Sequence, residues 1–178
     1  MENKSKPFHY FYLFLTGIIL SILAGLLTNM INGLISPLYF KSIMGWQNLT
    51  GIYHAIIAQG IFEGIIFGIF LSLFYTISVI FISRWRCTYR LGIGYLLFLF
   101  IIAIICWIIG GLLGLGLAGL SPDFFKNTFR SVPDNFNDML GYAWAGGSIW
   151  GIQFGGICTI FIGSLLFKIR WNKAGENE

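Results

Sequence analysis

The sequence predicts an all-α integral membrane protein whose four transmembrane helices form a bundle, and the first observation behind this prediction is composition. Hydrophobic residues make up 57% of the chain and charged residues only 10%, whereas a soluble domain carries about 25% charged residues. The second observation is that apolar residues gather in four runs, at 10–35, 55–83, 91–120 and 142–167. Each run exceeds the ~20 residues that a helix needs to cross a ~30 Å hydrocarbon core. Little other chain remains, so we expect one membrane domain over residues 1–178.

A third observation, an internal repeat, predicts how the helices are arranged. The word ISPLYFK at 35–41 returns as LSPDFFK at 120–126. Farther along, AQGIFEGIIFG at 58–68 resembles AGGSIWGIQFGG at 145–156, and the shared letters follow in the same order. Gly, Ile and Phe are abundant in this chain, so coincidence is the alternative. We interpret the pattern as a duplication.

The two predicted repeats cover residues about 10–86 and about 95–171. Each repeat contains two spans, so both copies would enter and leave the membrane on the same side. Parallel repeats of this kind are related by a pseudo-two-fold axis along the membrane normal. We therefore expect the first and second helices to superpose on the third and fourth.

The first span, 10–35, carries a polar stripe in its second half. The stripe falls within roughly 100° of arc on a helix that turns 100° per residue. Its members are Ser21, Gly25, Thr28, Asn29, Asn32 and Ser36. Polar groups in lipid require partners, so we expect the stripe to face the bundle. It would serve either hydrogen bonding within the bundle or a hydrated vestibule that opens outward.

Each repeat is predicted to contain a short helix at the outer membrane interface, at 36–44 and at 121–131. Both begin with the same dipeptide, Ser36-Pro37 in one and Ser121-Pro122 in the other. Serine at the N-cap accepts from free amides, and proline fits the first helical position. We expect the aromatic side chains to point inward and the lysines to face headgroups. These residues are Tyr39, Phe40, Phe124, Phe125, Phe129, Lys41 and Lys126. The alternative is an ordered turn.

Glycines recur at every fourth position in the second and fourth spans. They are Gly60, Gly64 and Gly68 in the second span, and Gly147, Gly151 and Gly155 in the fourth. A spacing of four places each set on one face of its helix. Such faces let helix backbones approach closely in lipid, where packing drives association. We predict that both sets are helix-packing surfaces.

Glu63 is the only acidic residue deep inside a predicted span. A carboxyl group within the membrane is costly and is therefore a candidate functional site. Glu63 lies at the edge of the glycine face, with Gln59 one turn before it. The repeat places Trp150 at the position equivalent to Glu63. If the two glycine faces meet at the pseudo-axis, Glu63 is expected to bond to Trp150, Gln153 or Ser148.

The candidate intramembrane polar site therefore combines residues of three spans. Its members are Glu63, Gln59, Trp150, Gln153, Asn29 and Asn32. Two interpretations stay open at this point. The residues form either a structural hydrogen-bond network or a site that handles ions or protons.

Basic residues gather on one side of the predicted membrane. Eight of the eleven lysines and arginines share this side: Lys4, Lys6, Arg84, Arg86, Arg90, Lys168, Arg170 and Lys173. The positive-inside rule then places both termini and the 84–90 loop in the cytoplasm, and we expect a plasma or inner membrane. No basic face is large enough to follow a nucleic acid, so we expect no such partner.

Motifs that would indicate an enzyme are missing from the sequence. It contains no nucleophile elbow, phosphate loop, CxxC, HExxH or pair of intramembrane acids. We therefore expect no catalytic residues, no cofactor and no metal site. We also expect no disulfide among the three cysteines, because no pair would lie in an oxidising compartment.

Two functional hypotheses remain. The first is an interaction or structural protein that packs with other membrane subunits or with copies of itself in the lipid bilayer. The alternative is a small oligomeric channel or transporter for ions or protons that uses Glu63 and the polar stripe. The two differ in whether Glu63 faces a cavity reached from water or a dry helix contact.

Overall fold

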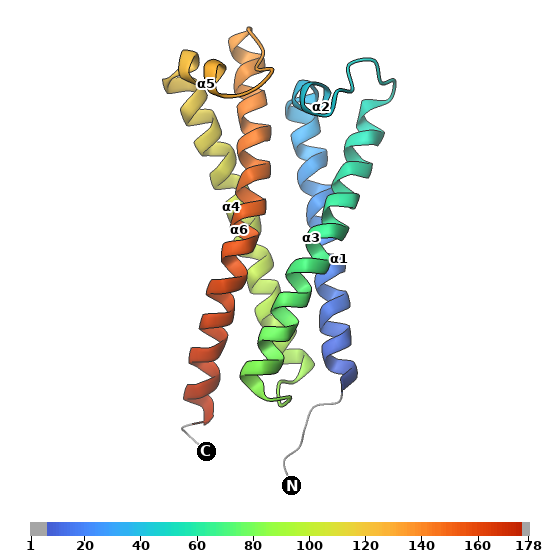
Figure 1. The fold of residues 1–178 in the computed structure, drawn as a ribbon, viewed down its shortest axis with the longest axis vertical. Coiled ribbons are helices and arrows are strands. Elements are labelled where there is room, and N and C mark those ends of the chain that lie inside the picture. The colour runs from blue at the N-terminus through green and yellow to red at the C-terminus, as the bar shows by residue number, and fades with distance from the viewer. Residues whose placement is uncertain (1–6, 176–178) are drawn as a thin grey trace.

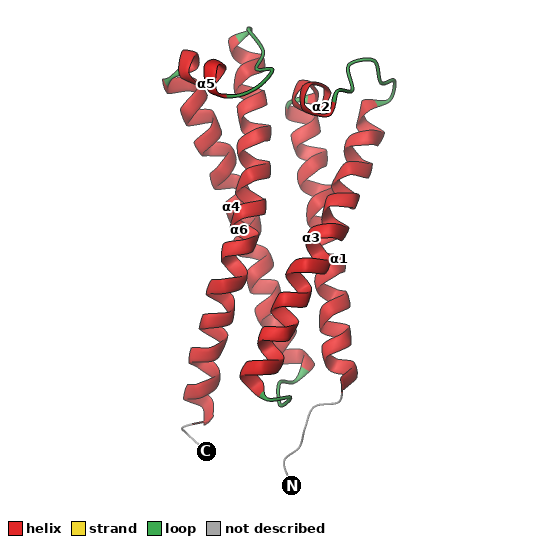
Figure 2. Ribbon diagram, viewed as in Figure 1, coloured by secondary structure: helices red, strands yellow, loops and turns green. Residues whose placement is uncertain are grey.

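The computed structural model describes residues 7–175, and within this range the chain forms six helices and no strands. The four long helices are α1 (Pro7–Ile35), α3 (Ile52–Ser83), α4 (Tyr89–Leu120) and α6 (Phe136–Gly175). The two short helices are α2 (Pro37–Met44) and α5 (Pro122–Thr128). Figures 1 and 2 show the long helices side by side along the molecule. All four are long and apolar enough to cross a membrane, which confirms the predicted spans.

The helices extend beyond the apolar runs from which they were predicted. The fourth run, 142–167, lies inside α6, which begins at Phe136 and ends at Gly175. A hydrophobic run reports only the part of a helix that contacts hydrocarbon. The polar residues at both ends of α6 continue the helix, because its backbone hydrogen bonds do not depend on lipid contact.

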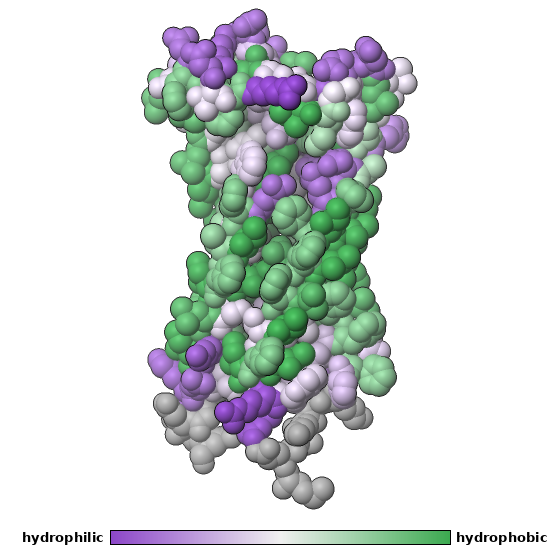
Figure 3. All heavy atoms as spheres, in the orientation of Figure 1, coloured by the Kyte–Doolittle hydropathy of each residue, from purple (hydrophilic) through white to green (hydrophobic). Residues whose placement is uncertain are grey.

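The long helices form two antiparallel pairs. The first hairpin consists of α1 and α3, and the second of α4 and α6 (Figure 1). Both short helices lie at one end of the molecule, which we call the α2–α5 end. The opposite end, where α1 begins and α6 ends, also holds the 84–88 loop between α3 and α4. We call it the basic end, after its arginines and lysines. Figure 3 shows hydrophilic side chains at the two ends and an apolar band between them.

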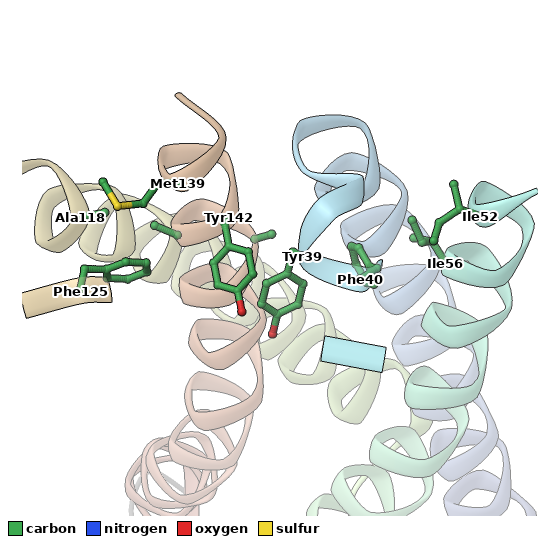
Figure 4. Close-up of a cluster of buried hydrophobic side chains, with 10 residues drawn as sticks. Tyr39, Phe40, Ile52, Ile56, Ala118, Phe125, Met139 and Tyr142 are labelled. Atoms are coloured by element: carbon green, nitrogen blue, oxygen red, sulfur yellow. The ribbon is translucent and has the colours of Figure 1, made fainter. Parts of the chain in front are cut away.

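The buried side chains form one hydrophobic cluster at each end. At the α2–α5 end, Figure 4 shows Tyr39 and Tyr142 side by side where the two hairpins meet. Phe40 packs on the side of the first hairpin, and Met139 on the side of the second. The cluster at the basic end includes Tyr10, Leu13, Tyr75, Val79, Leu96, Leu99 and Phe167. The buried hydrophobic side chains are therefore concentrated at the two ends of the molecule.

The two Ser-Pro words both begin short helices, but only one serine caps its helix with its side chain. Ser36 Oγ accepts a 3.3 Å hydrogen bond from the amide of Tyr39. The Ser121 side chain makes no capping bond. Its amide instead donates to the Leu117 carbonyl at 3.0 Å and so closes the preceding helix. The expected side-chain cap at Ser121 is therefore wrong.

The aromatic residues of the short helices divide into buried and exposed sets. Phe40 and Phe125 are buried, as is Tyr39. Phe124 and Phe129 are 56% and 41% exposed, so they do not belong to the buried cluster, and their insertion into the membrane stays a prediction. The helix α5 ends at Thr128, so the predicted extension to residue 131 is wrong. A single short helix can turn only one face toward the bundle.

Candidate functional site

The glycines of α3 hold the first hairpin together through backbone contact. A β-carbon built on Gly64 would lie 2.6 Å from both the Ile22 α-carbon and the Ser21 carbonyl oxygen. One built on Gly60 would overlap the Gly25 carbonyl oxygen. A side chain at either position would force α1 and α3 apart, so the hydrogen atom of glycine is what allows this approach.

The glycines of α6 do the same within the second hairpin. A β-carbon on Gly151 would lie 2.9 Å from the Gly110 α-carbon, and one on Gly155 would lie 2.8 Å from Cys106 Sγ. The two glycine faces thus pack against α1 and α4 and do not meet each other. The meeting of these faces at a central axis, which was the condition for the bonds predicted for Glu63, does not occur, because each face is already covered by the partner helix of its own hairpin.

Glu63 is held by two amide side chains of the first hairpin. Asn29 Nδ2 on α1 donates to Glu63 Oε2 at 3.2 Å. Gln59 Nε2, one turn before Glu63 on α3, donates to Oε1 at 2.9 Å. Asn29 is only 2% exposed, and Glu63 is half-buried. The structure therefore brings together three of the six predicted site residues around one carboxyl group.

Trp150 lies away from this network. Its side chain is 54% exposed and stacks on Phe154, with 5.2 Å between the ring centroids. The expected bond from Trp150 to Glu63 is therefore not formed. The rotation of α6 explains this, since its glycine face is turned toward α4 and Ile149 toward the cavity, which leaves Trp150 on the outer surface.

Asn32 and Ser148 form a second polar contact, which joins the two hairpins. Ser148 Oγ on α6 donates to Asn32 Oδ1 on α1 at 3.0 Å, and both residues are fully buried. Asn32 Nδ2 has no hydrogen-bond partner among the described residues. Ser148 was expected to serve Glu63, and its actual partner lies one turn away on the stripe of α1. The polar stripe was the signal that could have identified this pair.

A cavity of about 130 Å³ lies between the two hairpins. It is lined by side chains from all four long helices, and most of them are apolar. The polar residues on its wall include Ser21, Thr28, Asn29, Glu63, Gln153 and Thr159. Figure 3 shows hydrophilic side chains in the otherwise apolar face between α3 and α6. Glu63 and Gln153, on different hairpins, therefore share one cavity, and among residues 7–175 no other acidic residue lines it.

The wall of the cavity includes residues that belong to, or pack against, the two buried clusters. Ile149 on its wall packs against the cluster at the α2–α5 end, while Tyr75, Leu96 and Leu99 belong to the cluster at the basic end. Tyr75 also donates to the Gly92 carbonyl at 2.8 Å and so links α3 to α4. Residues of both clusters therefore reach the wall of the cavity that contains Glu63.

Two tyrosines pack together in the buried cluster at the α2–α5 end. The rings of Tyr39 and Tyr142 meet edge to face at 5.1 Å (Figure 4). Burial raises the pKa of Tyr39 to about 12, with smaller contributions from nearby Tyr142 and Glu63. Its hydroxyl group is therefore neutral at physiological pH. Tyr142 donates its hydroxyl proton to the Arg130 carbonyl at 2.7 Å.

Residues 7–175 contain no cluster of side chains that would form a metal centre. No group of three or more His, Cys, Asp or Glu side chains in the described chain could hold a metal ion. The chemistry within reach of Glu63 is therefore that of one carboxyl group, two amides and nearby hydroxyls. These groups can bind a cation or a proton.

Comparisons with known proteins give no relative from which a function could be transferred, so the functional assignment depends on the contacts described above. No protein-family model, no curated protein and no solved structure matches this chain.

Proposed function

We propose that the protein is a small channel or transporter for protons or small cations, with Glu63 as its binding group. One observation carries this proposal. Glu63 lies on the wall of a cavity between the two hairpins, whereas a purely structural carboxyl group would be enclosed in a helix contact. Ionisable groups inside membranes are rare, and they mark ion and proton pathways when they line cavities.

The position of the cavity supports this proposal. In transporters built from repeats, substrate sites lie at the interface between the repeats, near the middle of the bilayer. Here each hairpin is closed internally by glycine contacts, and the space lies between the hairpins. Relative movement of two rigid hairpins would change access to Glu63 without breaking either hairpin.

The proposal includes the duplication that the sequence predicts, with a pseudo-two-fold axis along the membrane normal. Both halves have the same order of elements, a long helix, a short helix that begins at Ser-Pro, and a second long helix. In both halves the glycines of the last helix pack on the first helix. Superposition of residues 10–83 on 95–168 should give a rotation of about 180° if parallel repeats are present.

The carboxyl group of Glu63 retains binding capacity beyond its observed contacts. A carboxylate offers about four lone-pair sites, and the two amide donors occupy one on each oxygen. Its remaining sites can accept a proton or contact a cation. Gln153, on the opposite hairpin, adds an amide to the same cavity.

We further propose that several copies assemble in the membrane, because one ionisable group per path is few for a cation pathway. The orientation that we propose has both chain ends in the cytoplasm of a plasma or inner membrane. The common location of the 84–88 loop and the ends of α1 and α6 supports it (Figure 1). This end carries Arg84, Arg86, Arg90, Lys168, Arg170 and Lys173.

The second candidate function is an interaction protein that packs with other membrane subunits or with itself. The hydrogen bonds from Asn29 and Gln59 favour it, because a carboxyl group with two amide partners can serve a structural network. In that case the cavity would be a packing defect between the hairpins, and Glu63 would contribute only to stability.

Flux measurements in proteoliposomes separate the two functions. We expect wild-type protein to carry protons or monovalent cations along an imposed gradient and Glu63→Gln to lose this flux. Asp138→Asn removes one carboxylate at the start of α6, outside the cavity, and should keep the flux. Absence of flux from correctly inserted wild-type protein would overturn the transport proposal. Equal flux from wild type and Glu63→Gln would overturn the role of Glu63.

A further inference from the structure

A groove lined by other residues than the cavity that contains Glu63 lies at the basic end. Its volume is about 690 Å³, and it runs between the end of α3, the 84–88 loop and the last turns of α6. The residues that define its chemistry are Phe81, Arg84, Arg86, Lys168, Trp171 and Asn172. The two hairpins both contribute to it, since Lys168 and Trp171 belong to α6.

The lining of this groove combines positive charge with apolar and aromatic surface. Arg84 and Lys168 approach it from different hairpins, and no acidic residue lines it among the described residues. Phe81 is 79% exposed, and Trp171 is half-buried. Tryptophan rings favour the level of the lipid headgroups. The groove therefore offers cations at the membrane surface and an apolar wall directly beside them.

The general excess of basic residues at this end does not account for the groove. Arg90 and Arg170 lie at the same end and carry the same charge, yet they do not line it. Topology requires only that basic residues be on this side of the membrane. It does not require residues of two hairpins to meet around one space with aromatic walls.

We propose that this groove binds the phosphate headgroup of an anionic phospholipid. Arginine matches phosphate through paired N–H donors, while lysine adds a compact charge. Basic pockets between helices at the membrane surface are suited to headgroups that carry more than one negative charge. The phosphate would lie between Arg84 and Lys168, and an acyl chain would follow the exposed face of Phe81 into the bilayer.

Binding at this site would connect the two hairpins at the basic end. The phosphate would contact the loop that follows α3 and the last turns of α6 at the same time. A phospholipid with a phosphomonoester headgroup fits better than a zwitterionic one, because the described residues contribute at least two cations and no acid to the lining of the groove.

The test uses the full-length protein in detergent micelles with added phosphatidic acid, phosphatidylcholine or inorganic phosphate. Native mass spectrometry reports retained lipid, and thermal unfolding reports stabilisation. We expect wild-type protein to retain phosphatidic acid in preference to phosphatidylcholine. The double variant Arg84→Gln/Lys168→Gln should lose about 10- to 30-fold in affinity, at roughly the contribution known for each basic residue near a charged membrane.

The matched control is Arg90→Gln/Arg170→Gln, which removes the same charge from the same end outside the groove. It should retain phosphatidic acid as wild type does, and gel filtration checks that both double variants are folded. Equal loss in the two double variants would overturn the groove as a specific site, as would retention of phosphatidic acid by Arg84→Gln/Lys168→Gln. Displacement of the lipid by millimolar inorganic phosphate would overturn the lipid as the source of the anion.

Discussion

Ser148 on α6 donates a 3.0 Å hydrogen bond to the amide oxygen of Asn32 on α1, and through this bond the two hairpins contact each other in a fully buried place. Within each hairpin, glycine contacts bring backbones together along the helices. Between the hairpins, the packing is interrupted by the cavity that contains Glu63. The Asn32–Ser148 bond is thus a specific polar link between the hairpins toward the α2–α5 end, and the Tyr75–Gly92 bond is another nearer the basic end.

Replacing Ser148 by alanine should destabilise the protein, because Asn32 Oδ1 then stays buried without its donor. Intramembrane hydrogen bonds are worth about 0.6 to 2 kcal/mol, so we expect a loss of about 1 kcal/mol. Thermal unfolding in detergent measures this. Ser164→Ala on the same helix is the control, since Ser164 Oγ is buried without a hydrogen-bond partner among the described residues. A similar loss in both variants would contradict the role of the Asn32 bond.

Gly64→Leu should be far more disruptive than the same change at Gly116. A side chain at Gly64 meets the backbone of α1 at 2.6 Å, whereas nothing lies within 4 Å of a β-carbon at Gly116. Overpacking of this kind costs about 1–3 kcal/mol, and more where backbone must move. Gel filtration and thermal unfolding in detergent should show loss of folded protein for Gly64→Leu alone. Equal tolerance of the two leucines would show that α1 and α3 are not in backbone contact.

Glu63→Gln should change stability by less than about 1 kcal/mol, because glutamine keeps the shape and can still accept from Asn29. Glu63→Leu leaves the amide donors of Asn29 and Gln59 without their acceptor and should cost about 2 kcal/mol. Denaturant titration of the purified variants measures both. A loss from Glu63→Gln as large as that from Glu63→Leu would mean that the negative charge itself stabilises the fold.

Cys87, in the loop between α3 and α4, should react slowly with alkylating reagents at neutral pH. Burial raises the pKa of its thiol from about 9 to about 11, and only the thiolate is a good nucleophile. In a variant with Cys106 and Cys158 changed to alanine, the rate with iodoacetamide should keep rising up to about pH 11. A plateau near pH 9 would show an accessible, ordinary thiol.

The raised pKa of the Cys87 thiol also makes the stability of the protein depend on pH. Between about pH 9 and about pH 11 the unfolded thiol ionises before the folded one, so the unfolded state binds fewer protons. The free energy of unfolding should therefore fall as pH rises through this window. The fall should be smaller in Cys87→Ala, measured by denaturant titration.

Cysteine labelling tests the proposed orientation. In a variant without native cysteines, a membrane-impermeant reagent applied outside should modify Asn48→Cys and leave Arg86→Cys unmodified, as the charge distribution predicts. Permeabilised cells provide the control, since both positions should then react. Modification of position 86 alone from outside would reverse the orientation.

The four long helices could be predicted from sequence because the length of an apolar run reports directly on membrane crossing. The burial of Thr28, Asn29 and Asn32 likewise follows from periodicity on one helix. The partners of Glu63 could not be predicted in the same way. Periodicity shows that Gly64 and Gly151 each lie on a packing face, but it does not show which helix covers that face.

The cavity and the groove could not be predicted from the sequence, for a related reason. Both arise where two hairpins meet, and their positions depend on small rotations of whole helices. The side chain of Trp150 illustrates this. Trp150 directly precedes Gly151 of a predicted packing face, yet it lies on the outer surface and is 54% exposed.

The order in which the chain is synthesised gives the Asn32–Ser148 bond a consequence for assembly. Asn29 finds its partner Glu63 within the same hairpin, so that pair can form as soon as α3 has entered the membrane. Asn32 must wait for a residue 116 positions later on α6. Until α6 is inserted, the unmatched amide of Asn32 is exposed to lipid or to water. We expect cellular quality control to recognise the inserted first hairpin as incomplete while Asn32 lacks its partner. A chain truncated after α3 should therefore be degraded rapidly.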